Sequence, residues 1–410
     1  MKITEPKIGA IVALTVLLAF TGARTLGAAT CSVPSVSYPT IQSAVDDSSC
    51  ATINVAPGLY AENVSIARSL TLNGAQAGMP TAGRISGSPA ESTVQGANLT
   101  GSMPVILINA AHVTVDGFTL KNSVTANAAI GVEIKPISTY TNLTNNIVDG
   151  INTADPGGIA EAVFIESGAF ATMIDKNLLR NISGSQSARA VLLGDGNPAN
   201  VLSVVNVQYN TITGVTSING GAYGLLLVNA LDSGGLFISY NDFSNIEGST
   251  LVHGLSFENN SNVMSAVSNN YTNLIGPATD NKAVWFSAND PDVYRADLSS
   301  SNFNLTVASY AVAIDPSVNV GGNMVNAECC WWGSPDGPGP VGPGHGARVS
   351  PNVLYAFWRF APAPMGGCLG NNVPTTAAQC KNGGWAAATR PDGTTFRNQG
   401  DCLQYLNNGN

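Results

Sequence analysis

A short segment after residue 288 brings together four side chains that can do chemistry. The sequence Asn289-Asp290-Pro291-Asp292-Val293-Tyr294-Arg295 contains two carboxylates, a phenol and a guanidinium. Two acids and an arginine suit a uronate or a cation, and a nearby phenol or guanidinium can move a proton. A solvated turn built on the Asp-Pro pair is the alternative interpretation. We predict Asp290, Asp292 and Arg295 as candidate catalytic residues.

The strands that would position such a cluster share one pattern. Six segments begin with a small residue and carry apolar residues at their second and fourth places. This alternation is the period of a strand with one buried face. The segments are GVEIK from Gly131, AVFIE from Ala162, AVLLG from Ala190, GLLLV from Gly224, GLSFE from Gly254 and AVWFS from Ala283.

The third place of these segments points outward and forms a strip when the strands are stacked. Phe164, Leu226 and Trp285 lie on this strip, and we predict them as candidate ligand-binding residues that stack on a sugar ring. Cover by a loop or by a partner protein is the alternative. At the fifth place, Lys135 falls beside Glu166 of the next coil, which predicts a surface ion pair.

A second pattern lies downstream of these strands. Five nine-residue segments start at residues 143, 174, 207, 238 and 266, so the starts differ by 31, 33, 31 and 28. A period of this length indicates stacked units that cannot bury their apolar faces alone. Their fourth place is always an asparagine, a residue that tolerates a left-handed turn. Its amide can bond to the units on either side, which predicts a structural ladder of Asn146, Asn177, Asn210, Asn241 and Asn269.

The repeats predict an all-β fold, a right-handed parallel β-helix solenoid with two or three short strands in each coil. Weaker units extend the series, with Asp116 and Asn323 in the asparagine place. Over residues 35–360 the sequence resembles the pectin-lyase-like superfamily of β-helix proteins. A β-sandwich or a propeller is the alternative, but its hairpin Asn-Gly turns are scarce here.

Both ends of the solenoid also resemble those of this superfamily. PTIQSAVDDSSC, from Pro39, resembles its opening segment, in which Ile41, Ala44 and Val45 form a short amphipathic capping turn. WWGSPDGPGP, from Trp331, resembles a closing segment, whose bulky rings would plug the other end.

Composition and termini indicate an exported protein. The chain has 410 residues, 10% of them charged, and a net charge of −9, which disfavours nucleic acid as a partner. An apolar run over residues 8–23 follows two lysines, so we predict a signal peptide over residues 1–29, with an uncleaved anchor as the alternative. No other segment is long enough to span a bilayer, so we expect no membrane span after signal cleavage. The remaining regions are predicted as a β-helix with caps (30–360), a linker (361–379) and a small Cys-bounded tail (380–410).

Seven cysteines in an exported chain indicate disulfides. Cys31 and Cys50 flank the capping turn, and Cys380 and Cys402 bracket the tail, so we predict these two pairs. Cys368 is left to pair with either of two neighbouring cysteines, Cys329 or Cys330, which leaves one free thiol.

The superfamily resemblance implies a carbohydrate ligand but no particular reaction. Pectin-lyase-like folds include polysaccharide lyases, hydrolases, esterases and epimerases, as well as proteins without a known reaction. The chain contains no complete catalytic motif of these enzymes, and we predict no cofactor and no metal, although a calcium ion is compatible with the acidic cluster. We expect a monomer, secreted or on the cell surface, that binds or processes an extracellular polysaccharide or cell-surface glycan. A non-catalytic surface scaffold or adhesin is the alternative.

Overall fold

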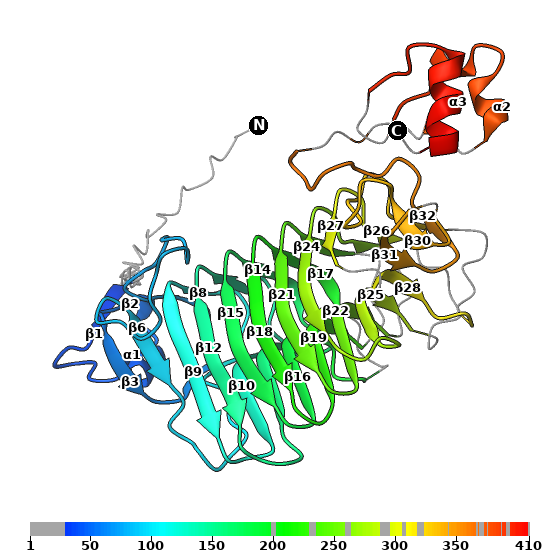
Figure 1. Ribbon diagram of the computed structural model, residues 1–410. Helices are drawn as coiled ribbons and strands as arrows, with labels where there is room; N and C mark the ends of the chain where they lie inside the picture. The colour runs from blue at the N-terminus through cyan, green and yellow to red at the C-terminus, as the bar shows by residue number, and fades with distance from the viewer. Residues whose placement is uncertain are drawn as a thin grey trace, which may run out of the picture.

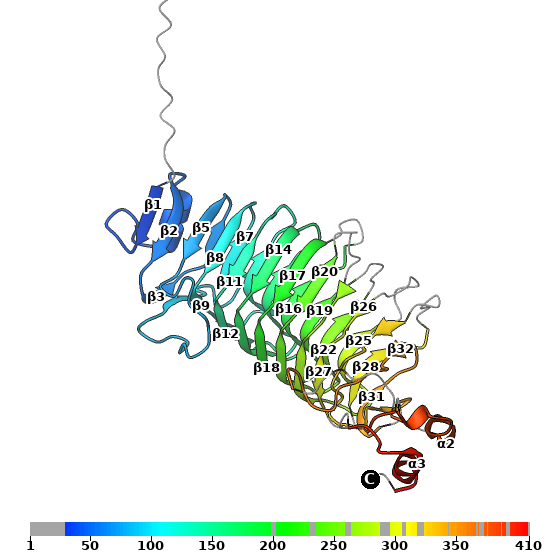
Figure 2. The ribbon, with the colours of Figure 1, turned by 90° about the horizontal axis from the view of Figure 1, so that it is seen from above.

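The computed structural model describes residues 29–197, 202–228, 235–258, 264–287, 296–305, 309–317, 324–342, 344–365, 368, 373–374, 376–386, 388–390 and 394–408. Within them the chain winds into a parallel β-solenoid, with the N-terminal strands at one end and a small helical module beyond the other (Figures 1 and 2). Residues 1–28 of the predicted signal segment (1–29) and the predicted catalytic residues Asp290, Asp292 and Arg295 lie outside the described residues, whereas Ala29, the last residue of that segment, begins β1.

The strands form three sheets that run along the solenoid, so each regular coil contributes one strand to each sheet. The twelve-stranded sheet contains β1 (Ala29–Val33), β2 (Cys50–Val55), β5 (Leu70–Asn73), β8 (Val113–Asp116), β11 (Asn142–Thr144), β14 (Phe170–Asp175), β17 (Ser203–Gln208), β20 (Leu236–Ser239), β23 (Met264–Ser265), β26 (Ala296–Asp297), β29 (Val325–Asn326) and β32 (Val353–Leu354). The eleven-stranded sheet contains β4 (Val64–Ile66), β7 (Ile106–Ile108), β10 (Ala128–Ile134), β13 (Ile159–Ile165), β16 (Ser187–Leu193), β19 (Gly221–Leu227), β22 (Leu251–Phe257), β25 (Asn281–Phe286), β28 (Tyr310–Ile314), β31 (Gly346–Val349) and β30 (Pro338–Pro340). The nine-stranded sheet contains β3 (Gly58–Ala61), β6 (Ser92–Gln95), β9 (Phe118–Val124), β12 (Ile147–Thr153), β15 (Leu178–Gly184), β18 (Thr211–Ser217), β21 (Asp242–Gly248), β24 (Asn270–Ile275) and β27 (Asn302–Asn304).

The stacking register of the eleven-stranded sheet follows the alignment of the repeats. Val163 of β13 lies opposite Val132 on one side and Val191 on the other, and Leu225 continues the same row. Neighbouring strands are parallel throughout this run, because each coil returns to the same sheet in the same direction. The predicted all-β parallel β-helix is therefore confirmed, with three strands in each regular coil.

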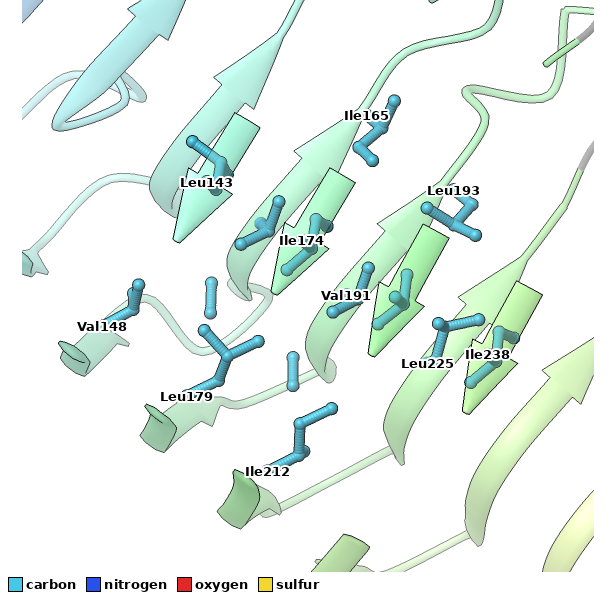
Figure 3. Close-up of a cluster of buried hydrophobic side chains, with 14 of the residues drawn as sticks. Leu143, Val148, Ile165, Ile174, Leu179, Val191, Leu193, Ile212, Leu225 and Ile238 are labelled. Atoms are coloured by element: carbon cyan, nitrogen blue, oxygen red, sulfur yellow. The ribbon is translucent and has the colours of Figure 1, made fainter. Parts of the chain in front are cut away.

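The core is a set of apolar rows that run along the solenoid axis. Figure 3 shows Leu143, Ile174 and Ile238 in one row, and Val148, Leu179 and Ile212 in the row that faces it; all six side chains are buried. Toward the C-terminal end the second row becomes aromatic, and successive ring centroids of Phe243, Tyr271, Phe303 and Trp332 lie 5.2 Å apart. Each coil thus buries its apolar face on its neighbours, as the repeat pattern requires.

The five repeated asparagines lie inside the turn between the twelve-stranded and nine-stranded sheets. The backbone N–H groups of Asn146, Asn177, Asn210 and Asn241 each donate to the side-chain oxygen of the asparagine in the next coil, at 2.9–3.0 Å. Each side-chain amide also donates to a backbone carbonyl of the preceding coil, as Asn210 does to Ile174. The result is a buried hydrogen-bonded ladder along the stack.

The asparagine was predicted to be the left-handed residue of this turn, but the residue before it adopts that conformation. Positive φ angles occur at Asn145 (50°), Lys176 (55°), Tyr209 (55°), Tyr240 (58°) and Ser268 (57°). The asparagine is therefore selected for its buried hydrogen bonds rather than for its backbone conformation.

The ends of the ladder differ from the prediction. In the first of these coils Phe118, not Asp116, takes the asparagine place, and its N–H donates to Asn146 at 3.0 Å. Asp116 instead pairs in register with Thr144 of β11, two residues earlier in the turn. At the other end Ser301 takes the asparagine place and accepts from the N–H of Asn269 at 3.3 Å. Cys330 takes this place in the following coil, where its thiol donates to the backbone carbonyl of Leu298. Asn323 lies outside the described residues.

Both ends of the solenoid are covered. At the N-terminal end α1 (Ile41–Asp46), capped by Thr40, buries Ile41, Ala44 and Val45, and the predicted Cys31–Cys50 disulfide ties β1 to β2. The opposite end contains the buried ring of Trp332 and a Cys329–Cys368 disulfide, which leaves Cys330 as the free, buried thiol.

The C-terminal module is small and helical. It contains α2 (Ala377–Cys380), the 3₁₀ helix η1 (Gly384–Ala386) and α3 (Gln399–Asn408). The predicted Cys380–Cys402 disulfide joins α2 to α3. Among the described residues, no helix has the length and apolar character needed to cross a bilayer.

Candidate functional site

The outer face of the eleven-stranded sheet presents a row of charged and aromatic side chains. The row crosses seven consecutive strands, from β13 to β31, in direct register: Glu161, Arg189, Tyr223, His253, Lys282, Tyr310 and Arg348. This polar row was not predicted from the sequence, where the third and fifth places of the repeated segments indicated the outward strip and the ion pair instead. The row is formed by the residue directly before the small first residue, a position where the residue type changes from each coil to the next.

The predicted outward strip lies beside the polar row. Phe164, Leu226 and Trp285 do fall in one row of the same sheet, together with Leu192 and Ser256. Leu226 is buried, however, as are Leu192 and Ser256, whereas Phe164 and Trp285 are partly exposed. The exposed part of the strip is thus interrupted by buried side chains between Phe164 and Trp285.

The two rows meet through side chains three residues apart on one strand. On β22 the Nδ1 atom of His253 lies 3.1 Å from the hydroxyl of Ser256. On β25 the Nζ atom of Lys282 lies 3.9 Å from the ring centroid of Trp285, which is a cation–π contact. These contacts connect the polar row to the strip over the middle and C-terminal coils.

Within the polar row Glu161 and His253 are buried, and the charge of Glu161 is compensated. Arg189 donates to Glu161 at 2.7 Å, and burial nevertheless raises the pKa of the Glu161 carboxyl. Burial, with a smaller contribution from Lys282, lowers the pKa of His253 to about 3, so its imidazole is neutral. Its Nε2 atom has no hydrogen-bond partner among the described residues. The ring lies between Tyr223 and Trp285, at centroid distances of 5.7 and 5.9 Å.

A second charged cluster lies at the C-terminal ends of β10 and β13, and here the predicted ion pair is present. Lys135 contacts Glu166, and it also donates to Glu133 at 2.9 Å. Burial raises the pKa of the Glu166 carboxyl, and the contact with Lys135 opposes that shift. One ammonium therefore holds both carboxylates, which leaves neither of them as an isolated charge.

The polar row opens to solvent at a cavity of about 560 Å³ on β25, β28 and β31. Its walls include the aromatic rings of Trp285 and Tyr310, the ammonium of Lys282, the carboxylate of Asp315 and the polar side chain of Asn352. Lys282 also pairs with Asp280. The guanidinium of Arg348 lies 4.5 Å from the ring centroid of Tyr310. We call this space the Trp285 cavity.

The Trp285 cavity combines apolar ring surface with hydrogen-bonding groups. Such a combination suits a ligand with C–H faces and hydroxyl groups, because rings contact the former and polar groups orient the latter. Among the described residues, no group of three or more histidine, cysteine, aspartate or glutamate side chains is arranged to hold a metal ion.

Comparisons with known proteins do not assign the chain to a family. No family model and no curated protein matches it. Among solved structures it is similar to the crystal structure of the Dettilon tailspike protein (gp208), with 11% sequence identity and a TM-score of 0.26. The match covers 70% of this chain and 62% of that one. A similarity this low carries no functional argument, and the pectin-lyase-like resemblance stays at the level of the sequence.

Proposed function

We propose that the protein is exported and binds an extracellular polysaccharide in the Trp285 cavity. The observation that carries the proposal is the pair of rings, Trp285 and Tyr310, in the wall of a cavity of about 560 Å³ that also contains charged and polar groups. Export is supported by the three disulfides in the described residues, because such bonds persist in oxidising compartments.

The cations beside the two rings support binding through pre-organisation. Lys282 lies over Trp285 and Arg348 over Tyr310, so each ring is held by a contact within the protein. A side chain that is already ordered loses less conformational entropy when a ligand binds. A sugar ring can then contact the aromatic surface, while Asp315 and Asn352 are placed to bond its hydroxyl groups.

The proposal concerns binding, and a reaction would require further groups. Asp290, Asp292 and Arg295 remain the predicted acid and proton-transfer residues, and they lie outside the described residues. If binding depends on a uronate-bound cation, or a reaction depends on acid chemistry, Asp292→Ala should abolish that binding or that reaction. If the protein only binds, Asp292→Ala should leave affinity unchanged.

A glycan array probed with the exported protein, together with a lyase and hydrolase screen, tests the proposal. We expect binding to at least one class of acidic or neutral glycan, and weaker binding by Trp285→Ala. A blank result across both classes would contradict glycan binding and favour the alternative, a surface scaffold or adhesin.

A further inference from the structure

A second cavity, of about 630 Å³, lies directly beside the Trp285 cavity. Val341 belongs to the walls of both. Residues 349–352 line the first cavity and residues 353–356 line the second, so one continuous segment passes from one to the other. The remaining wall includes Met324, Trp358 and, from the C-terminal module and the residues before it, Gln379 and Val373. We call this space the Leu354 cavity.

The chemistry of the Leu354 cavity differs from that of its neighbour. Met324, Val341, Val353 and Leu354 contribute only apolar side chains. The polar atoms of its two aromatic residues are already used: the hydroxyl of Tyr355 donates to the Val341 carbonyl at 3.1 Å, and Trp358 Nε1 donates to the Pro335 carbonyl at 3.0 Å. A hydroxyl-rich sugar would therefore find few free partners there.

Three apolar side chains of the Leu354 cavity are incompletely buried, whereas Val353 is buried. Met324 is 39% exposed, Val341 48% and Leu354 38%. Large apolar side chains that gather in a partly open cavity favour an apolar ligand, because the ligand removes their surface from water. The adjacent Trp285 cavity, which has charged and polar groups in its wall, would stay in contact with the polar part of the same molecule.

We infer that the two cavities form one amphipathic site, and that its ligand is a glycan bearing an acyl or alkyl chain. The sugar lies against Trp285 and Tyr310, and the chain passes Val341 into the Leu354 cavity. This inference rests on the proposed function for its sugar part, and it adds the apolar substituent that the second cavity selects.

Octyl β-glucoside and methyl β-glucoside test the inference, because they share a sugar and differ only in the chain. Titration calorimetry below the micelle concentration should give at least tenfold tighter binding for the octyl compound. Leu354→Lys should remove that difference, because an ammonium in the apolar cavity opposes the chain. The side chain of Leu354 is partly exposed, so this variant is expected to fold, and an unchanged melting temperature checks it.

Ile275→Lys is the matched control. Ile275 lies on β24 of the nine-stranded sheet, is 46% exposed and lines neither cavity, so this variant places the same charge on an apolar side chain outside the site. It should keep the octyl preference. Equal affinity of the wild type for both glucosides, or a preference that survives Leu354→Lys, would overturn the inference. If an array glycan still binds through Trp285, the proposed function stands while this inference fails.

Discussion

Replacing Asn210 with alanine tests the buried asparagine ladder, because this residue lies in its middle. The side-chain oxygen of Asn210 accepts from the backbone N–H and the side-chain amide of Asn177, at 2.9 and 3.1 Å. Its amide donates to the carbonyls of Ile174 and Gln208, both at 2.9 Å, and to Asn241 at 3.0 Å. Alanine removes all of these contacts and leaves the turn backbone in place.

The expected loss follows from the groups left without a partner. The backbone N–H of Asn177 becomes an unsatisfied buried donor, which costs about 1–3 kcal/mol, and each further lost hydrogen bond contributes about 1 kcal/mol or less in net terms. We expect Asn210→Ala to lower the free energy of unfolding by about 2–4 kcal/mol. Asn210→Ser should lose less, because Ser301 fills the same place by accepting from Asn269 and donating to the carbonyl of Ala266.

Chemical denaturation of the wild type and of both variants measures these losses. Asn206→Ala is the matched control, because Asn206 lies on the same coil, on the outer face of β17, and is partly exposed. The predicted order of stability is wild type and Asn206→Ala first, then Asn210→Ser, then Asn210→Ala. Equal losses for Asn206→Ala and Asn210→Ala, or no loss for Asn210→Ala, would refute the reasoning.

Three further predictions concern the cysteines and the buried histidine. Cys31→Ser/Cys50→Ser should lower stability by about 3 kcal/mol in thermal denaturation, because the bond closes a loop with a sequence separation of 19; an unchanged melting temperature would contradict this. His253, whose pKa falls from 6.5 to about 3 on folding, binds its proton more readily in the unfolded state. The free energy of unfolding should therefore fall by a few kcal/mol as pH drops through that window, and pH titration of His253→Gln should show a shallower fall than the wild type. Burial raises the pKa of Cys330 to about 12, so a thiol reagent should label it only after unfolding, and rapid labelling of the native protein would contradict the structure.

The regular part of the fold could be predicted because it repeats. Apolar residues at fixed places aligned β13, β16 and β19 correctly, since each coil must place the same face toward the same core. The ends of the ladder could not be aligned in this way. Phe118 and Cys330 occupy the asparagine place with unrelated side chains, so no residue type marked the register.

The candidate site was only partly predictable. Trp285 was found because it is an aromatic residue at the outward third place of a repeated segment, but burial of Leu226 depends on packing that the spacing of residues does not reveal. Lys282 and Tyr310 belong to a row whose members share a position but change in residue type from each coil to the next. The cavity also requires β31 and residues 349–352 to lie beside β28. This placement depends on how the closing segment folds back onto the solenoid.

Binding at the Trp285 cavity is the central claim, and titration calorimetry with a glycan identified on the array tests it most directly. The wild type is compared with Trp285→Ala and with Tyr240→Ala, which removes a half-exposed ring stacked on Tyr209 at a corner of the twelve-stranded sheet. Loss of the Trp285 ring should weaken binding by about tenfold, because one aromatic contact contributes a few kcal/mol at most. Tyr240→Ala should bind like the wild type. Equal dissociation constants for the wild type and a folded Trp285→Ala variant would contradict the account.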